Sequence, residues 1–453
     1  MSAMIRRVAA AVLLTLASAA WAQQQSRLPH RVWLSAGVPT ADVLAELRSA
    51  GIDELAVPVG DAELGETTTR FTMRPMPDLK PLAGWSVTAL VWVSGQGKEL
   101  GDAEQFWTQF APTLRMLPGK GSLLLVAPQY FEGLPRFAAA VAEESGQSVG
   151  LALSAQELAA HLPVGGWPGI ELVPVAFGNP QAFGFPPSTI HDDVTALDEI
   201  DQRGTPYRPA VVVGWRATPA PGPQPVSLSL ITRGNVATYT PGARGDVFAL
   251  KLPVDWGGTR LDVGQKVEVE VVETARYHRD LGLVLRPTRA NLVGWDTVSL
   301  PSGEPALGMS REAFLDYLRG GMPFPTPDVE LAVNGAFVSV GLRNPSPHAS
   351  AIATTGNWVE LHYSGTEVRD VQLGEFSGVQ FGRLEGGVFK EIVARDATLV
   401  RLYLPYVAPR SRVGGGAVAF LSAPRTLAVR WGLRLGDGSV VGGPLESRDV
   451  RTR

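Results

Sequence analysis

The stretch SLLLVAPQYFEGLPRFAAAVAEESGQSVGLALSAQELAAHLPVGGWPGIELVPV, residues 122–175, decides the fold of this chain. It holds three short runs of apolar residues, each continuous rather than alternating: 122–127, 149–153 and 170–175. Two segments with helical spacing of apolar residues, 134–145 and 155–161, separate these runs. Continuous apolar strands are typical of parallel sheets, which crossover helices bury on both faces. The stretch therefore predicts consecutive strand–helix units of a parallel sheet.

The same alternation continues on both sides of this stretch. Further strands are predicted at 31–37, 54–59, 86–93, 209–215 and 292–300. Helices are expected to begin after Thr40, Asp102 and Ser310, residues that favour the first position of a helix. No Gly-x-Gly-x-x-Gly motif follows the first strand, which argues against a dinucleotide-binding sheet. We therefore expect an α/β fold, a (β/α)8 TIM-like barrel, rather than an open doubly wound sheet.

A β-rich segment interrupts the barrel pattern, and more β structure follows it. We predict a barrel domain over 23–321 with a β-rich excursion at about 219–273, before the last strand. Strands are expected there at 226–231 and 266–272, and a returning helix at 274–285. MPFPTP, residues 322–327, is a short, stiff linker. The strand and turn pattern of 328–453 predicts an antiparallel β-sandwich.

The amino terminus has the three parts of a secretory signal peptide. Arg6 and Arg7 precede an uncharged apolar run, and Ala20 and Ala22 supply the small residues of a cleavage site. We therefore predict a signal peptide over 1–22 and an exported protein, periplasmic or extracellular. No later apolar run reaches the ~18 residues that a membrane span requires.

Composition excludes several classes of partner. The chain has 40 basic and 44 acidic side chains, and removal of 1–22 takes two arginines, leaving 38 against 44, a net charge of −6. A mildly acidic chain without basic clusters is not expected to bind nucleic acid. It has no cysteine, so disulfides and thiolate ligands are excluded. We expect no cofactor and no metal, and interpret His191, Asp192 and Asp193 as an acidic helix start.

Several stretches together resemble a family of secreted bacterial proteins known as domain of unknown function 3142. They are RVWLSAGVPTADVLAELRSAGIDEL, PQYFEGLPRFAAAVAEESGQSVGLALSAQEL, GWPGIELVPVAFG, GWDTVSLPSGEPALGMSREAFLDYLRG and PTPDVELAV. The resemblance covers roughly residues 30–345. It implies a glycosidase-like barrel followed by a β domain, and it implies no known substrate.

The sequence departs from an active glycosidase barrel at the fourth strand. Barrels similar to the chitinases carry acidic residues at its end, where this chain has Pro128, Gln129 and Tyr130. Hydrolysis of a glycosidic bond needs two carboxyl groups at a defined separation. Asp61 and Asp296 are the carboxylates that could form such a pair across the barrel mouth.

Aromatic and amide side chains near strand ends are candidates for binding a ligand. Sugar rings stack on aromatic faces, and polar neighbours fix their hydroxyl groups. The candidates are Trp92, Gln129, Tyr130, Trp215 and Trp295.

Three hypotheses follow. The first is an exported protein that binds a polysaccharide or cell-envelope glycan on a glycosidase-like barrel without hydrolysing it. The second is an active glycoside hydrolase that uses Asp61 and Asp296. The third is a periplasmic structural or assembly protein whose C-terminal β domain binds a protein partner.

Overall fold

The structure is a computed structural model. It describes residues 28–448 apart from 35–36, 77, 96–100, 120, 177–184, 186–187, 223, 225, 227, 243–244 and 302–307. The expected signal peptide, 1–22, lies outside the described residues. The described residues form two compact units: the first contains the chain up to Val213, 280–300 and 318–320, and the second contains 214–279, 301–317 and the chain from Gly321.

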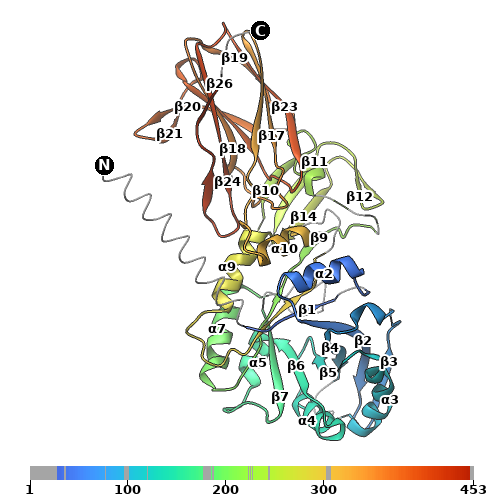
Figure 1. The fold of residues 1–453 in the computed structure, drawn as a ribbon. Helices are drawn as coiled ribbons and strands as arrows, with labels where there is room; N and C mark the ends of the chain where they lie inside the picture. Colours follow the sequence, from blue (N-terminus) through green and yellow to red (C-terminus); the bar gives the residue numbers. More distant parts are fainter. Residues whose placement is uncertain are drawn as a thin grey trace. The chain divides into compact units, whose positions relative to one another are not determined.

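The first unit is built on a closed ring of eight parallel strands (Figure 1). In ring order they are β1 (His30–Trp33), β2 (Glu54–Leu64), β4 (Ser86–Ser94), β5 (Ser122–Val126), β6 (Val149–Ser154), β7 (Ile170–Ala176), β8 (Ala210–Val212) and β15 (Trp295–Val298). β1 pairs with both β15 and β2, which closes the ring. The expected fold class, a TIM-like barrel followed by antiparallel sheets, is confirmed.

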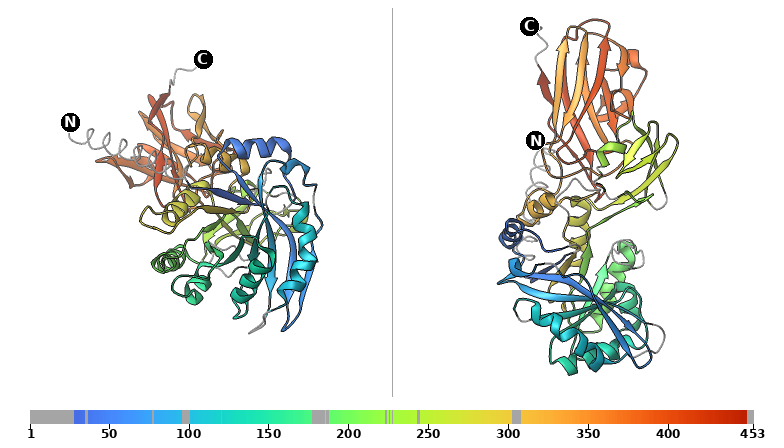
Figure 2. Two further views of the ribbon diagram at one scale, coloured as in Figure 1. Left: turned by 60° about the horizontal axis from the view of Figure 1, so that its bottom comes forward. Right: turned by 90° about the vertical axis from the view of Figure 1, so that its right-hand side faces the viewer.

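Helices follow most of the ring strands, and α3, α4, α5 and α7 lie outside the strands (Figure 2). The helices of the first unit are α2 (Ala41–Ser49), α3 (Ala103–Met116), α4 (Leu134–Ser145), α5 (Ala155–His161) and α7 (Ile190–Gln202). The boundary between the units falls within α9 (Thr274–Val284), and nearly all of α10 (Arg311–Leu318) belongs to the second unit. Two of the predicted caps form: Asp102 accepts a hydrogen bond from the Gln105 amide at 2.8 Å, and Ser310 accepts one from the Ala313 amide at 3.1 Å. Thr189 caps α7 in the same way, which fits the helix start predicted around His191. Thr40 precedes α2 without a side-chain cap hydrogen bond.

The structure differs from the predicted strands in two places. Residues after Val59 continue β2 beyond the end of the predicted strand, and the chain then returns as β3 (Thr69–Met73) in an antiparallel hairpin. The predicted strand at 226–231 is wrong, because residues 228–231 form a one-turn helix, α8 (Leu228–Ile231). Leu228 and Ile231 are buried three residues apart, on one face of that turn, whereas a short apolar run does not by itself distinguish strand from helix.

The β-rich excursion belongs to the second unit. Its strands are β9 (Trp215–Thr218), β10 (Ala237–Pro241), β11 (Asp246–Leu250), β12 (Val254–Trp256), β13 (Thr259–Leu261) and β14 (Lys266–Val271). Four of them form a sheet in the order β10-β11-β14-β9. Phe248, Trp256 and Val267 of the excursion share a buried cluster with Tyr406 and Ala408 of the C-terminal part. The excursion is therefore packed on the β structure that follows the barrel in sequence.

The C-terminal part consists of two antiparallel sheets. One has the order β16-β17-β23-β19, and the other has the order β21-β20-β22-β18-β24-β25, with β26 also paired to β24. The bounds are β16 (Asp328–Asn334), β17 (Phe337–Arg343), β18 (Asn357–Ser364), β19 (Val368–Gln372), β20 (Gly378–Glu385), β21 (Val388–Glu391), β22 (Leu399–Leu404), β23 (Arg412–Phe420), β24 (Thr426–Arg434), β25 (Val440–Gly442) and β26 (Glu446–Arg448).

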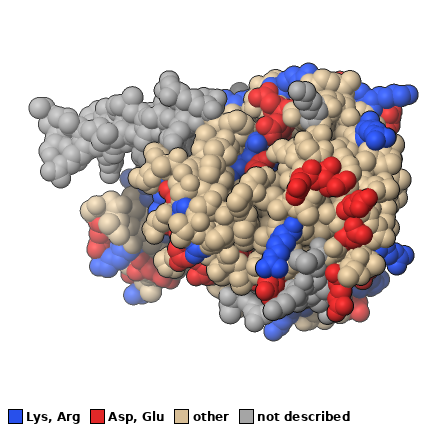
Figure 3. All heavy atoms as spheres, turned by 90° about the horizontal axis from the view of Figure 1, so that it is seen from below, with Lys and Arg blue, Asp and Glu red and all other residues tan. Residues whose placement is uncertain are grey.

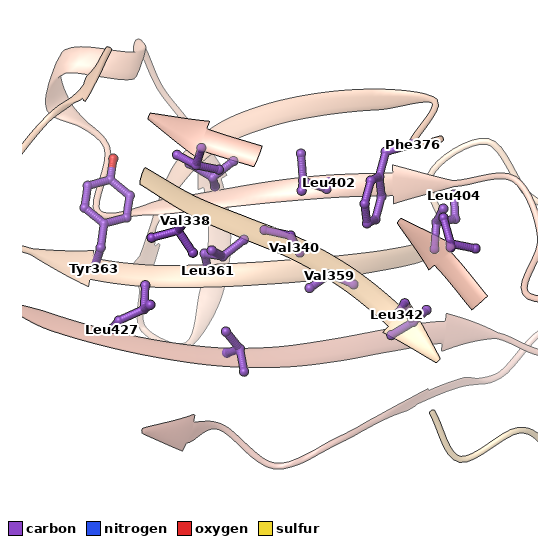
Figure 4. Packing of buried hydrophobic residues seen from close by; sticks show 14 of the residues in the cluster. Val338, Val340, Leu342, Val359, Leu361, Tyr363, Phe376, Leu402, Leu404 and Leu427 are labelled. Atoms are coloured by element: carbon purple, nitrogen blue, oxygen red, sulfur yellow. The ribbon is translucent and has the colours of Figure 1, made fainter. Parts of the chain in front are cut away.

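Side chains from both sheets meet in a hydrophobic core (Figure 4). Val338 and Val340 of β17 face Val359 and Leu361 of β18, and all four are at most 2% exposed. Every second residue of these strands points inward, so the residues between them lie on the outer faces.

Charges are mixed on the face of the molecule drawn in Figure 3. Acidic and basic side chains are interspersed there among uncharged residues, and neither sign forms one continuous patch. Among the described residues, none of the helices has the length and apolar character needed to span a bilayer.

Candidate functional site

A bulge in β2 determines where Asp61 points. Up to Pro58, β2 and β4 pair in step, with Ala56 and Leu90 facing the barrel interior. The register then shifts between Pro58 and Gly60, so that Asp61 lies opposite Trp92. Trp92 is two residues beyond Leu90 and faces the same way. The extra residue therefore turns Asp61 toward the interior side at the carboxyl end of the strands, the end at which barrel proteins bind ligands.

Gly60 allows this bulge to pack against the β2–β3 hairpin. A Cβ atom at Gly60 would lie 2.3 Å from Cε2 of Phe71 and 2.8 Å from the carbonyl oxygen of Thr72. Phe71 in turn packs edge-on against Phe106 and Phe110 of α3, with centroid distances of 5.8 and 5.6 Å. The hairpin is thereby held on the outside of the barrel beside the bulge.

Arg74 joins Asp61 to Trp92. Its Nε and Nη2 donate to the two carboxylate oxygens of Asp61 at 2.8 and 2.6 Å, and its guanidinium carbon lies 4.4 Å from the Trp92 ring centroid. The hydrogen bonds from the guanidinium to Asp61 raise the pKa of Arg74. The side chains of Arg74 and Asp61 are 41% and 47% exposed, and Trp92 is half-buried. We call Asp61, Arg74 and Trp92 the mouth triad.

A second aromatic group follows the fourth ring strand. Tyr130 stacks on His161 of α5 at a centroid distance of 3.7 Å and an interplanar angle of 6°. Burial and the neighbouring Glu132 carboxylate raise the pKa of Tyr130. Gln129, beside it, is exposed. Gln129 and Tyr130 thus lie where the sequence predicted polar and aromatic side chains.

Asp296 lies near the amino-terminal ends of the strands, in a buried ionic network. Its Oδ2 accepts hydrogen bonds from Arg31 Nε at 2.9 Å and from Trp33 Nε1 at 2.7 Å. Arg208 Nε lies 2.7 Å from its other oxygen, close enough for an ion pair but without the alignment of a hydrogen bond. Glu54 pairs with Arg208, and Glu171 pairs with Arg31. The Asp296 side chain is fully buried.

Asp61 and Asp296 therefore do not share one site. Asp296 lies opposite Arg31, and Arg31 lies opposite Glu54 at the start of β2. Asp61 is seven positions further along β2, which at about 3.3 Å per residue corresponds to roughly 20 Å. The carboxyl pairs of glycosidases are about 5–10 Å apart. Asp61 and Asp296 are therefore too far apart to form such a pair.

The two remaining tryptophan candidates lie elsewhere. Trp295 is 2% exposed and stacks on His30 at 3.5 Å, so its ring faces are not open to a ligand. The seventh ring strand ends at Val212, earlier than predicted, and Trp215 begins β9 in the second unit. Trp215 is half-buried there and packs beside the cluster of Phe248 and Val267. Trp295 is thus separated from the mouth triad along the strands, and Trp215 belongs to the second unit.

The barrel interior above the ionic network is apolar. It is filled by Trp33, Leu90, Val126, Val175 and Phe185, and each of the remaining ring strands contributes at least one smaller residue. On the fourth strand the inward-facing residues are Leu124 and Val126. Among the residues that the structure describes, the inward-facing carboxylates at the carboxyl end are those of Asp61 and Glu63, both on β2.

Sequence reasoning did not find Arg74 or His161 as partners at the mouth. Arg74 follows the unpredicted hairpin, and its contact with Asp61 depends on the bulge. The His161 stack depends on how α5 lies beside the loop after β5. The Glu157–His161 spacing of four residues was the available signal, and that ion pair is 3.6 Å long.

No protein-family model matches this chain, and no curated protein matches it. Among solved structures, it is similar to the spore cortex-lytic enzyme SleL of Bacillus megaterium, with 10% identity, 60% of this chain and 70% of that chain covered, and a TM-score of 0.39. It is also similar to SpGH29, with 8% identity, 86% and 94% coverage, and a TM-score of 0.27.

Proposed function

We propose that this chain is an exported protein, periplasmic or extracellular, that binds a polysaccharide or cell-envelope glycan at the barrel mouth without hydrolysing it. The mouth triad is the observation that carries this proposal. Trp92 offers an aromatic surface to the C–H face of a sugar ring. The half-exposed Arg74 and Asp61 offer donors and acceptors to its hydroxyl groups, already held in place by their mutual hydrogen bonds.

The same contacts argue against hydrolysis. Both carboxylate oxygens of Asp61 accept hydrogen bonds from Arg74, so neither can contact a glycosidic oxygen unless that pair breaks. Glu63 lies on the same strand as Asp61 rather than across the mouth. The fourth strand contributes Val126 and Pro128 in place of an acid.

The proposal is tested with purified residues 23–453 and a panel of peptidoglycan and neutral and acidic polysaccharides, by isothermal titration and affinity electrophoresis. Arg74→Gln and Trp92→Ala are expected to weaken binding about tenfold or more. Arg48→Gln is the matched control, because Arg48 also stacks on a tryptophan, Trp85, at 4.5 Å. That stack lies at the opposite end of the ring, beside the start of β4.

Release of reducing ends from the bound glycan should stay at background. Hydrolysis that disappears in Asp61→Asn would contradict the non-hydrolytic part of the proposal. Absence of glycan binding, together with a stable protein partner captured by the C-terminal sheets, would favour the assembly hypothesis instead.

A further inference from the structure

The outer face of the seven-stranded sheet that contains β18 carries an unusual set of side chains. On β18, Val359 and Leu361 point into the core (Figure 4), so Trp358, Glu360 and His362 take the outer face. Arg401 and Tyr403 of β22 and Arg430 of β24 lie on the same face, because they pair with these residues or lie two positions from such a pair. Aromatic and cationic residues therefore alternate across three neighbouring strands.

Two aromatic rings lie flat against glycines of this face. A Cβ atom at Gly432 would lie 2.3 Å from the Trp358 ring, and one at Gly382 would lie 2.5 Å from the Phe389 ring. Gly432 is the cross-strand partner of Trp358. Any larger residue at either position would lift the ring off the sheet. The glycines thus keep this part of the face flat.

A guanidinium group connects the two rings. The Arg401 guanidinium carbon is 4.6 Å from the Trp358 centroid and 3.9 Å from the Phe389 centroid. The guanidinium of Arg430 is 5.4 Å from the Trp358 centroid. Such cation–π contacts fix long side chains that would otherwise be mobile on a surface.

Glu360 binds both arginines and fixes their positions. It is fully buried and accepts hydrogen bonds from Arg401 Nε at 2.8 Å, Arg430 Nε at 2.5 Å and His362 Nε2 at 3.1 Å. Burial alone would raise the pKa of Glu360, but the hydrogen bonds from His362, Arg430 and Arg401 lower it to about 2. The carboxylate is therefore ionised, and it fixes the orientation of two guanidiniums.

Two guanidiniums share the Glu360 carboxylate. A second carboxylate on this face, that of Glu391, accepts a hydrogen bond from Gln380 at 3.1 Å. Arg401 uses Nε and Nη2 for Glu360, and its Nη1 lies 3.5 Å from the Tyr403 hydroxyl. Among the described residues, the Arg430 guanidinium donates a hydrogen bond through Nε alone. The Arg430 side chain is 29% exposed. The terminal fork of Arg430, with two parallel N–H groups, has the geometry that matches a carboxylate.

We propose that this platform, formed by Trp358, Glu360, Phe389, Arg401, Tyr403 and Arg430, binds a carboxylate-bearing acidic polysaccharide. Arg430 receives a sugar carboxylate, and the sugar ring lies along the flat aromatic and guanidinium surface. A flat surface suits an extended chain rather than a small molecule. The exposed fork of Arg430 favours a polymer with carboxylates over a neutral one. This site is in the second unit and adds to the proposed function, with which it shares the class of ligand.

The test uses residues 23–453 and polygalacturonate, with neutral dextran as the comparison polymer, in affinity electrophoresis and titration calorimetry. We expect binding to polygalacturonate and none to dextran. Arg430→Gln should weaken binding about tenfold or more, and Arg430→Lys should recover part of it, because the charge returns without the fork. The matched control is Arg412→Gln on the other sheet, whose side chain is 73% exposed and pairs with Glu330. Thermal unfolding checks that each variant is folded.

The outcomes separate this inference from the barrel-mouth proposal. If Arg430→Gln binds polygalacturonate like wild type, or if Arg412→Gln weakens binding as much, the platform is not the site. Equal binding of dextran would also overturn it. Loss of binding in Arg74→Gln but not in Arg430→Gln would overturn the platform and leave the mouth proposal intact. Loss in Arg430→Gln but not in Arg74→Gln would support the platform and show that polygalacturonate does not bind at the mouth.

Discussion

The carboxylate of Asp296 accepts a hydrogen bond from the indole nitrogen of Trp33 at 2.7 Å, inside the barrel. The same oxygen accepts a hydrogen bond from Arg31 Nε, and both the Trp33 ring and the Asp296 carboxylate are fully buried. Asp296 and Arg31 are also cross-strand partners in the pairing of β15 with β1, the pair of strands that closes the ring. We interpret Asp296 as a structural residue of the closure rather than as a catalytic one.

Asp296→Asn should therefore destabilise the protein strongly. The substitution leaves Arg31 and Arg208 buried with less compensating charge, and breaking a buried ion pair costs about 3–5 kcal/mol. Urea unfolding followed by tryptophan fluorescence measures the change. Asp61→Asn, at a half-exposed carboxylate, is the control and should cost about 1 kcal/mol or less. Equal stability of the two variants would refute the structural role.

Gly60→Ala should distort the barrel mouth. The new Cβ would overlap the Phe71 ring and the Thr72 carbonyl, and forced overpacking costs about 1–3 kcal/mol. Glycan binding should fall with it, because the bulge that directs Asp61 would shift. Gly414→Ala is the control, since nothing lies within 4 Å of a Cβ there. A Gly60→Ala protein with wild-type stability and binding would show that the bulge is dispensable.

Stability should fall as the pH drops through the ordinary range of histidine. Burial and the nearby Arg208 lower the pKa of His30 well below its usual 6.5. Below pH 6.5 the unfolded chain binds a proton at His30 that the folded chain does not, so the free energy of unfolding decreases with acidification. The slope from this residue is at most about 1.4 kcal/mol per pH unit. Denaturant unfolding between pH 7.5 and 5.5 should show a shallower slope for His30→Gln.

His161→Gln provides the comparison for that experiment, because His161 is 42% exposed on α5. It is expected to keep the wild-type slope. An unchanged slope in His30→Gln would mean that another group controls this pH range.

The second unit should lose stability at lower pH, through Glu360. Its pKa falls from the usual 4.5 to about 2 in the folded protein, which corresponds to about 3 kcal/mol. A depressed carboxylate pKa stabilises the fold above pH 4.5, and this contribution is lost as the pH falls from 4.5 toward 2. Glu360→Gln should unfold more easily at pH 7 and lack this component of acid sensitivity. Glu330→Gln, on the other sheet, should retain it, and the opposite pattern would contradict the role of Glu360.

The barrel could be predicted from the sequence because its strands are buried on both faces. Runs such as 122–127 and 149–153 are apolar without interruption, and this pattern has few other interpretations. The hairpin strand β3 and the strand β19 were not predicted, because they expose most of their residues and are rich in polar side chains. Exposed antiparallel strands are stabilised by their partners, which a single sequence does not reveal.

The candidate site was predictable only in part. Asp61 and Trp92 were expected at strand ends, and the structure places them opposite each other. Their contacts with Arg74 depend on a one-residue register shift between β2 and β4, which the periodicity of apolar residues in the sequence does not reveal. Asp296 was expected at the mouth, but it is the second residue of β15 and lies opposite Arg31, near the start of β1. The functional roles of Asp61, Trp92, Gln129 and Tyr130 remain predictions.

The discontinuous first unit affects the order in which this protein can be completed. β15 is translated after the whole excursion, yet it supplies the hydrogen bonds that β1 and β8 both lack until then. A nascent chain that ends before Trp295 presents two unpaired parallel edges, the kind of surface that recruits foreign strands. Truncation after Val213 would therefore yield a fragment that aggregates rather than a smaller barrel. The ribosome or the translocase must deliver about eighty further residues before the ring can close.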